Sequence, residues 1–437
     1  MLLKQYINQQ LRYNYYFYQR LKAVQKQEQW SEQQLKEEQN RKFINLLRRA
    51  YKHSPFYRKF YQEHAVHIGQ IQTVEDVTQL PVLTKKEVRD HCREIFIGNK
   101  CNRVSAYTSG TTGKPTQVYR NYQSTIEEGA YQWAYRMKLG HTPGMKTVVL
   151  KGNLRRDCKE IYDPFAKTLE LSSYHLSQKN ARWYYDKISK FRPNAILAYP
   201  SSVESLANLF HSLNTCFEIP LVFTSSETLY GHQRNKIEAT FNCKIADWYG
   251  NAERTIALQQ KEDGNYENLP LYSFETFYED YLLSTGLSNS CFPLINYRVD
   301  DIIKPMVKRT KSCRYTVSHI QGRSDDKLIL RDGTRIGLLW GAFDRVPNLC
   351  KAQIVQYRPE CFEVNIVPGD KFRAEDESFL NKKLREFVGD DAVFSIHKVA
   401  DSKIIRSKTG KYKLVVNYFL KKHTQQMLHT KSAAQLS

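Results

Sequence analysis

Hydrophobic residues follow two different periods in the middle of the chain. Short apolar runs occur at 147-TVVL-150, 195-AILAY-199, 220-PLVFTS-225 and 243-CKIADWYG-250. Longer segments with helical spacing separate them, such as 203-VESLANLFHSL-213 and 230-YGHQRNKIEATF-241. Strands that alternate with helices indicate βαβ units and a parallel sheet. In such sheets, ligands bind on loops beyond the carboxyl ends of the strands.

The N-terminal part is polar and has mostly helical spacing. The segment 32-EQQLKEEQNRKFINLLRRAYKH-53 carries its apolar residues at Leu35, Phe43, Leu46, Leu47 and Ala50. Two interpretations stay open for this region. It is either an amphipathic helix that covers the main domain, or a basic, Tyr-bearing surface that rests on an anionic membrane. Further along, Thr84 and Glu87 have the spacing of a capping box.

The pattern changes near Arg323. The segment 322-GRSDDKLILRDGTRIG-337 combines polar turns with a short apolar strand, and strand-like 352-AQIVQYR-358 and 362-FEVNIV-367 follow. A smaller α+β module is therefore expected. The predicted organisation of this α/β protein is an N-terminal helical extension (1–42), a large N-terminal domain (43–321) and a small C-terminal domain (322–437).

Composition is that of a folded protein with more than one domain. The chain has 437 residues, of which 41% are hydrophobic. No window approaches the ~18 apolar residues of a membrane-spanning helix, and the N-terminus lacks a secretory h-region, so a cytoplasmic location is expected. The nine Cys are scattered and form no metal-binding motif, which favours reduced thiols.

The net charge of +21 suits nucleic acid, anionic lipid or a polyanionic substrate. Because the basic residues are spread along the chain and no nucleic-acid reader motif occurs, nucleic-acid binding is not expected. Peripheral contact with the inner face of a membrane, through the basic N-terminal segment, stays open.

The most unusual stretch is 107-YTSGTTGKPTQVY-119. Its glycines, hydroxyl groups and lysine form the donor set that cradles a phosphate chain, and a flexible linker is the alternative. It is not a Walker A loop, because Pro115 follows Lys114. The candidate phosphate-binding residues are Thr108, Ser109, Gly110, Thr111, Thr112, Gly113 and Lys114.

This loop resembles the phosphate-binding signature of the adenylate-forming enzymes, which include acyl-CoA synthetases and adenylation domains. Four further stretches resemble that superfamily's motifs in the right order: 247-DWYGNAER-254, 296-NYRVDDI-302, 322-GRSDD-326 and 407-SKTGKYK-413. The flanking segments 54-SPFYRKFY-61, 80-LPVLTKKEVRDH-91 and 198-AYPSSVESLA-207 resemble the phenylacetate-CoA ligase branch and its CapK-like relatives in capsule biosynthesis. The resemblance implies a large ATP- and substrate-binding domain and a small, mobile C-terminal lid.

The resemblance also implies an ATP site. The loop would wrap the phosphates, Tyr249 would stack on adenine, and Asp301 would accept hydrogen bonds from the ribose hydroxyls, with Arg323 nearby. A surface ion pair is the alternative for Asp301 and Arg323. Ser226, Glu227 and Gly250 would complete the adenine and ribose contacts.

Catalytic roles are carried over in the same way. Glu253 would hold Mg²⁺ at the phosphates, or be merely a carboxylate at a helix start. Lys411 would reach the carboxylate and the α-phosphate, although a lone Lys on such a basic tail is usually solvated. Asp325 matches the hinge between two poses of the C-terminal domain.

Two departures from the family motifs stand out. Ala252 lies where many relatives carry Thr or Ser, which removes a hydroxyl. Val299 and Asp300 lie where Thr and Gly are common, so a second carboxylate adjoins Asp301.

The acyl-substrate pocket is expected at strand-end loops, with Tyr174, His175, Tyr199 and Pro200 as candidates. For His175, a core or surface position is the more common alternative.

The predicted function is that of an ATP- and Mg²⁺-dependent ligase. It would activate a small or nucleotide-linked carboxylic acid as an acyl-adenylate, releasing pyrophosphate, and then transfer the acyl group. The acceptor would be an amine in surface polysaccharide biosynthesis or, alternatively, the thiol of coenzyme A. A non-catalytic, nucleotide-binding scaffold of a polysaccharide assembly complex is the alternative of another class. The acid, the acceptor and the oligomeric state are not encoded in these motifs.

Overall fold

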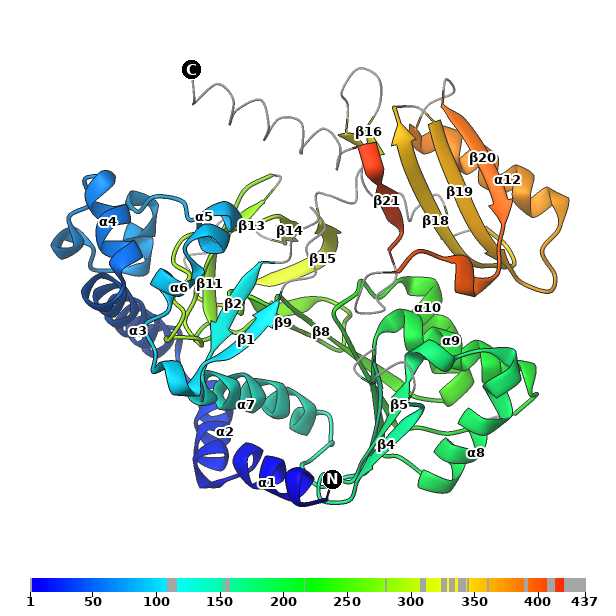
Figure 1. Cartoon of the computed structure of the whole chain (residues 1–437), viewed down its shortest axis with the longest axis horizontal. Coiled ribbons are helices and arrows are strands. Elements are labelled where there is room, and N and C mark those ends of the chain that lie inside the picture. The colour runs from blue at the N-terminus through cyan, green and yellow to red at the C-terminus, as the bar shows by residue number, and fades with distance from the viewer. Residues whose placement is uncertain are drawn as a thin grey trace. The chain divides into compact units, whose positions relative to one another are not determined.

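A computed structural model describes most of the chain (Figure 1). The described residues are 2–107, 116–151, 154, 158–215, 217–279, 281–306, 312–323, 328–329, 335–336, 343, 346–359, 361–388, 392–406 and 413–419. The chain forms two compact units. The large unit is built from Met1–Thr108, Thr116–Leu229 and Gln233–Ile320, and the small unit mainly from Gln321–Ser437.

A ten-stranded sheet forms the centre of the large unit, in the order β14-β15-β10-β9-β8-β7-β6-β3-β5-β4. Strands β5, β3, β6, β7 and β8 are parallel, as the alternating pattern predicts, whereas β4, β9, β10 and β15 pair antiparallel at its flanks. The bounds are β3 (Thr147–Lys151), β4 (Glu160–Asp163), β5 (Thr168–Ser172), β6 (Ala195–Ala198), β7 (Leu221–Ser225), β8 (Lys244–Gly250), β9 (Ala257–Gln260), β10 (Tyr266–Asn268), β14 (Asp301–Pro305) and β15 (Thr316–Arg323). The predicted α/β fold class is confirmed.

Helices cover both faces of this sheet (Figure 1). On one face lie α8 (Ala181–Phe191), α9 (Pro200–Ser212) and α10 (Gly231–Phe241), and on the other lie α2 (Tyr15–Gln27) and α7 (Tyr122–Lys138). Successive residues of β7 pack into different cores. Val222 lies in the core with α8, α9 and α10, and Phe223 lies in the core with α2 and α7. This two-sided burial explains why the central strands are continuously apolar.

A third core joins the N-terminal helices to a three-stranded antiparallel sheet, β11-β12-β13. Its elements are α3 (Glu32–His53), α4 (Pro55–Glu63), α5 (Lys85–Asp90), α6 (Cys92–Ile95), β11 (Ser273–Phe277), β12 (Leu282–Gly286) and β13 (Tyr297–Val299). The apolar face of α3 is buried here, which confirms the helix predicted from its spacing. The capping box is also confirmed, because the Thr84 amide donates to Glu87 Oε2 at 2.8 Å.

The small unit contains a four-stranded sheet in the order β20-β19-β18-β21, with α12 packed against it. The bounds are β18 (Leu349–Arg358), β19 (Cys361–Pro368), α12 (Ala374–Val388), β20 (Val393–Lys398) and β21 (Val415–Asn417), beside a two-stranded hairpin of β16 (Leu328–Ile329) and β17 (Arg335–Ile336). The strands predicted at 352–358 and 362–367 lie within β18 and β19.

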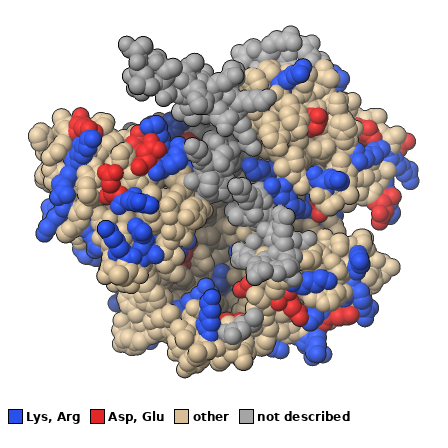
Figure 2. Space-filling view, viewed as in Figure 1, with Lys and Arg blue, Asp and Glu red and all other residues tan. Residues whose placement is uncertain are grey.

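Figure 2 shows Lys and Arg side chains distributed over the visible face instead of gathered in one patch. Among the described helices, none combines the length and the hydropathy needed to cross a membrane.

Candidate functional site

Several predicted site residues lie outside the described part of the chain. These are the phosphate loop Thr108, Ser109, Gly110, Thr111, Thr112, Gly113 and Lys114, together with Asp325 and Lys411. Arg323 and Tyr174 are described by their backbone alone, at the end of β15 and in the turn Ser173–His175. The attachment points of the loop are described: β1 (Val104–Tyr107) pairs antiparallel with β2 (Gln117–Arg120), so Tyr107 lies opposite Gln117.

The remaining candidates lie along one edge of the large sheet. Because β5, β3, β6, β7 and β8 are parallel, their carboxyl ends meet at the same edge. His175 follows β5, Tyr199 and Pro200 follow β6, Ser226 and Glu227 follow β7, and Tyr249 and Gly250 end β8. The strand order therefore gathers residues that are up to 75 positions apart in the sequence.

Tyr249 and Asp301 come from two different motifs and contact each other. The Tyr249 hydroxyl donates to Asp301 Oδ2 at 2.5 Å, which joins the end of β8 to the start of β14. The extra carboxylate of the motif is directed elsewhere, since Asp300 Oδ1 lies 3.2 Å from Arg298 Nε. Tyr249 thus orients Asp301, whereas Asp300 is paired with Arg298.

Glu253 lies in the loop between β8 and β9, not at a helix start. Its side chain is buried, with 6% of the residue exposed, and Glu253 Oε1 accepts a hydrogen bond from the Tyr297 hydroxyl at 3.2 Å. Within the described residues no ion pair is formed by this carboxylate. A buried carboxylate oriented by a neighbouring hydroxyl fits the role of a Mg²⁺ ligand, because Mg²⁺ in nucleotide sites is typically held by one or two carboxylates and the phosphates.

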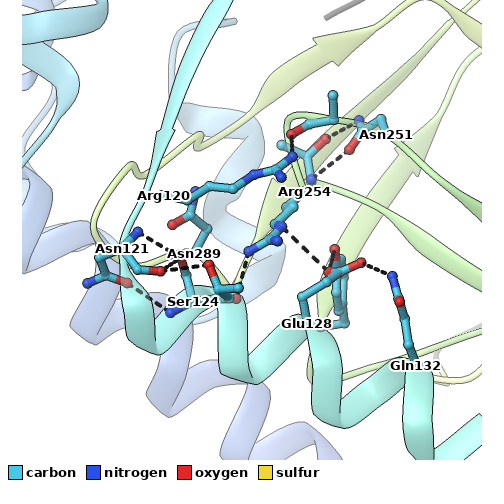
Figure 3. Close-up of polar contacts among 12 residues, drawn as sticks. Arg120, Asn121, Ser124, Glu128, Gln132, Asn251, Arg254 and Asn289 are labelled. Carbon is cyan, nitrogen blue, oxygen red and sulfur yellow. Dashed lines mark hydrogen bonds and ion pairs between the residues drawn. The ribbon is translucent and has the colours of Figure 1, made fainter. Parts of the chain in front are cut away.

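Two arginines from different elements fix the loop that carries Glu253 (Figure 3). Arg120, at the end of β2, donates from Nη2 to the Ala252 carbonyl at 2.6 Å. Arg254 donates from Nη1 to the Ser124 carbonyl at 2.7 Å, and its Nε lies 3.8 Å from Glu128 Oε2. Burial, and then the adjacent Arg254 charge, lower the pKa of Arg120 to about 10. The Arg120 guanidinium therefore links β2 to the loop, and the Arg254 guanidinium links the loop to α7.

The backbone of this loop is also constrained. Arg254 has φ +58°, a left-handed conformation that costs energy for a residue with a side chain. Asn251 receives the Thr255 amide on Oδ1 at 2.9 Å and donates from Nδ2 to Thr255 Oγ1 at 2.7 Å. A Cβ on Gly286 would lie only 2.6 Å from the Arg254 carbonyl oxygen, so only glycine fits there. Such strain persists only where its surroundings enforce it, which is common at functional sites.

The predicted acyl-pocket and nucleotide residues after β6 and β7 form a second group. Lys151 Nζ donates to Ser225 Oγ at 3.2 Å and lies 5.7 Å from the centre of the Tyr199 ring. Glu227 Oε2 accepts from the Ser201 amide at 3.1 Å, at the first turn of α9. Lys151 was not predicted from the sequence, although it ends a recognisable strand.

Three other candidates have local structural roles in the described geometry. Pro200 is buried at the first position of α9, where proline fits without loss of a hydrogen bond. Ser226 has φ +73°, which turns the chain at the end of β7. His175 Nδ1 lies 2.9 Å from Ser172 Oγ, so its ring is held by its own strand end.

Comparison with known proteins identifies relatives for both units. A family model for the CapK C-terminal domain matches residues 328–418. Protein CapK of Staphylococcus aureus is 26% identical over 341 residues, covering 74% of this chain and 74% of that protein. Phenylacetate-coenzyme A ligase of Escherichia coli (strain K12) is 25% identical over 320 residues, covering 65% and 70% of the two chains.

Among solved structures, 2-hydroxyisobutyryl-CoA ligase in the postadenylation state, in complex with R3-HIB-AMP, has the same fold. It aligns with a TM-score of 0.67 at 15% identity, over 90% of this chain and 91% of that chain. The fold of this chain is therefore that of an adenylate-forming ligase. In sequence the chain is similar to CapK and to the phenylacetate-CoA ligases, the branch that the sequence motifs predict.

Proposed function

We propose that this protein activates a carboxylic acid by adenylation, with ATP as the second substrate and pyrophosphate as the product. The observation that supports this most directly is the convergence of Tyr249, Glu253 and Asp301 at the carboxyl edge of the sheet. These residues come from two separate motifs, and each is held by a specific contact. A nucleotide site that only stabilised the fold would not need the buried carboxylate of Glu253.

In this proposal each residue has a defined task. Tyr249 stacks on adenine, Asp301 accepts hydrogen bonds from the ribose, and the loop from Thr108 to Lys114 surrounds the phosphates. Glu253 would hold Mg²⁺, and the ion would supply positive charge at the phosphates. Lys411 approaches the carboxylate and the α-phosphate and offsets the negative charge that develops during attack on phosphorus.

For the second step, the proposed acceptor is an amine used in surface polysaccharide biosynthesis. Two observations support it: the similarity to Protein CapK, and a net charge of +21 that would attract an anionic sugar acid. The similarity to phenylacetate-coenzyme A ligase favours the coenzyme A thiol instead, so the thiol is the alternative acceptor. A protein that acts on precursors of a surface polymer would also work beside the membrane, and peripheral contact belongs to the proposal.

The test is a pyrophosphate-release assay on the purified protein with Mg-ATP. Aryl acids, fatty acids and nucleotide-linked uronic acids are compared as substrates, first alone and then with coenzyme A or candidate amines. Release that depends on one class of acid, and that Lys411→Ala abolishes, supports adenylation. Faster AMP formation with an amine than with coenzyme A supports the polysaccharide role, and the reverse order supports a CoA ligase.

A non-catalytic scaffold is the second candidate. It predicts ATP binding without acid-dependent pyrophosphate release across all three classes of acid. The buried Glu253, which forms no ion pair among the described residues, favours the enzyme because a scaffold gains nothing from such a desolvated carboxylate.

A further inference from the structure

Helix α1 (Leu2–Arg12) is unlike the other long helices of the large unit because none of its residues is buried. Its apolar side chains are largely open to solvent: Leu2 is 61% exposed, Leu3 71%, Ile7 47% and Leu11 51%. Isolated helices of this length are marginal in water, so α1 needs packing or a partner. The exposed apolar face of α1 is therefore the surface on which a partner could pack.

The helix is turned so that its polar side faces its own domain. Gln5 and Gln9 are half-buried, and Gln5 Nε2 donates to the Tyr162 carbonyl at 2.9 Å. At about 100° per residue, Ile7 lies roughly 180° around the helix from the midpoint of these two glutamines, with Leu3 and Leu11 on either side. The stripe of Leu3, Ile7 and Leu11 thus points away from the protein. This is the reverse of an amphipathic helix that packs on a core.

The exposed apolar surface continues beyond α1. The Tyr6 ring contacts the Phe165 ring with their centres 5.3 Å apart, and Phe165 is itself 39% exposed in the turn between β4 and β5. In the same turn, Asp163 Oδ1 accepts hydrogen bonds from the amides of Phe165 and Ala166 at 3.0 and 3.1 Å. Tyr15, at the start of α2, is 78% exposed. Figure 1 shows α1 at the edge of the large unit, where a flat surface could approach it.

The charge within residues 1–27 has one sign, although Asp163 lies in the turn beside Tyr6 and Glu170 interacts with Arg12. Residues 1–27 contain no Asp or Glu, and they contain Lys4, Arg12, Arg20, Lys22 and Lys26. Arg20 is paired with Glu127 at 2.7 Å, but the other four are exposed. Apolar side chains flanked by Tyr, Lys and Arg are the composition of helices that lie in the interface of an anionic bilayer. A second copy of the chain would instead bring like charges together.

We propose that α1 docks on an anionic membrane, with Leu3, Ile7 and Leu11 inserted among the lipids and Lys4, Arg12, Lys22 and Lys26 near the headgroups. This inference specifies the membrane contact that the proposed function includes, and membrane binding can be measured without any enzymatic turnover. The occupant of the surface is the bilayer, and self-association is the competing outcome.

The experiment is co-sedimentation of the full chain with vesicles of phosphatidylcholine, alone or mixed with 30% phosphatidylglycerol. We expect binding to the mixed vesicles, at least tenfold weaker binding to phosphatidylcholine alone, and weakening by salt. The triple variant Leu3→Ser, Ile7→Ser, Leu11→Ser should lose at least tenfold in binding. Its matched control, Val82→Ser with Val393→Ser, removes exposed valines elsewhere and should bind as the wild type does.

Charge is tested separately with Lys4→Gln, Arg12→Gln and Lys22→Gln, which should each weaken binding about fivefold. Equal binding of the wild type and the Ser triple variant would overturn the proposal. The proposal would also be overturned if the wild type failed to bind vesicles and instead dimerised with increasing concentration, and if the Ser triple variant abolished that dimerisation. If adenylation fails in the assay above while vesicle binding holds, only the enzymatic proposal is lost.

Discussion

The Tyr249 hydroxyl donates a 2.5 Å hydrogen bond to the Asp301 carboxylate across 52 residues of sequence. If Asp301 binds the ribose, Tyr249 fixes its orientation in addition to stacking on the base. We expect Tyr249→Phe to raise the KM for ATP about tenfold and Asp301→Ala to raise it up to about a hundredfold, because hydrogen bonds to charged groups contribute about 1.5–3 kcal/mol. The measurement is the KM for ATP in the pyrophosphate-release assay.

Asp300→Asn is the matched control for these variants. Asp300 is the neighbouring carboxylate and is paired with Arg298, and both side chains are partly exposed. Surface pairs contribute about 0–1 kcal/mol, so the KM for ATP should change little. A larger effect at Asp300 than at Asp301 would mean that the ribose contact is assigned to the wrong carboxylate.

The Tyr297–Glu253 contact leads to a prediction about metal dependence. Tyr297→Phe removes the hydroxyl that orients the buried carboxylate, as a second-layer contact does in other metal sites. The Mg²⁺ concentration for half-maximal activity should rise about tenfold in Tyr297→Phe, and Glu253→Gln should reduce activity further at every Mg²⁺ concentration. The titration is performed at saturating ATP. An unchanged Mg²⁺ requirement in both variants would remove Glu253 from the metal site.

Arg120 is predicted to act through the position of the Glu253 loop, not through contact with substrate. Arg120→Met removes the hydrogen bond to the Ala252 carbonyl, and we expect kcat to fall on the order of tenfold or more because the loop shifts. The KM for the acid should stay nearly constant. Arg120→Lys can still donate to Ala252, so it should recover part of the lost activity.

The stability of the Arg120 variants separates positioning from general unfolding. Loss of this partly buried bond should lower the free energy of unfolding by about 1–3 kcal/mol in Arg120→Met. Denaturant unfolding provides the value. A kcat that is unchanged while stability drops would restrict Arg120 to a structural role.

A pH-dependent contribution to stability is expected from Glu275 on β11. Burial raises the pKa of Glu275 to about 7. Hydrogen bonds from Tyr315 at 2.7 Å and Ser284 at 3.4 Å lower the pKa, but by less than burial raises it. Between its ordinary pKa and 7, the folded state holds a proton that the unfolded state has released. The free energy of unfolding should therefore decrease as pH rises through this window, by up to about 3 kcal/mol.

Glu275→Gln should remove this part of the pH dependence, and the exposed Glu279→Gln should leave it in place. Urea unfolding of the two variants at pH 5, 6, 7 and 8 is the measurement. A Glu275→Gln curve parallel to the wild-type curve would show that Glu275 does not titrate in this range.

The central strands could be predicted from the sequence alone. Strands β3, β6, β7 and β8 are buried on both faces, so they appear as apolar runs bounded by helices. The antiparallel flank was not predicted, because strands such as β9 and β10 are short and mix polar with apolar residues. Their pairing depends on distant neighbours instead of on a local pattern.

The supporting contacts of Arg120 and Arg254 could not be predicted either, because they join residues that are distant in the sequence. Arg120 contacts a carbonyl 132 positions away and Arg254 one that is 130 positions away, and neither residue has a local signature. For α1 the helical spacing was visible, but its orientation was not. The exposure of Leu3, Ile7 and Leu11, together with the contact between Gln5 and Tyr162, shows that the apolar side faces outward.

The proposed reaction requires the formation of an acyl-adenylate, which acid-dependent exchange of labelled pyrophosphate into ATP detects without any acceptor. We predict exchange that requires one class of carboxylic acid and Mg²⁺, and that is lost in both Glu253→Gln and Lys411→Ala. Exchange that is absent with every acid although ATP binds, or that persists undiminished in both variants, would contradict adenylation at this site.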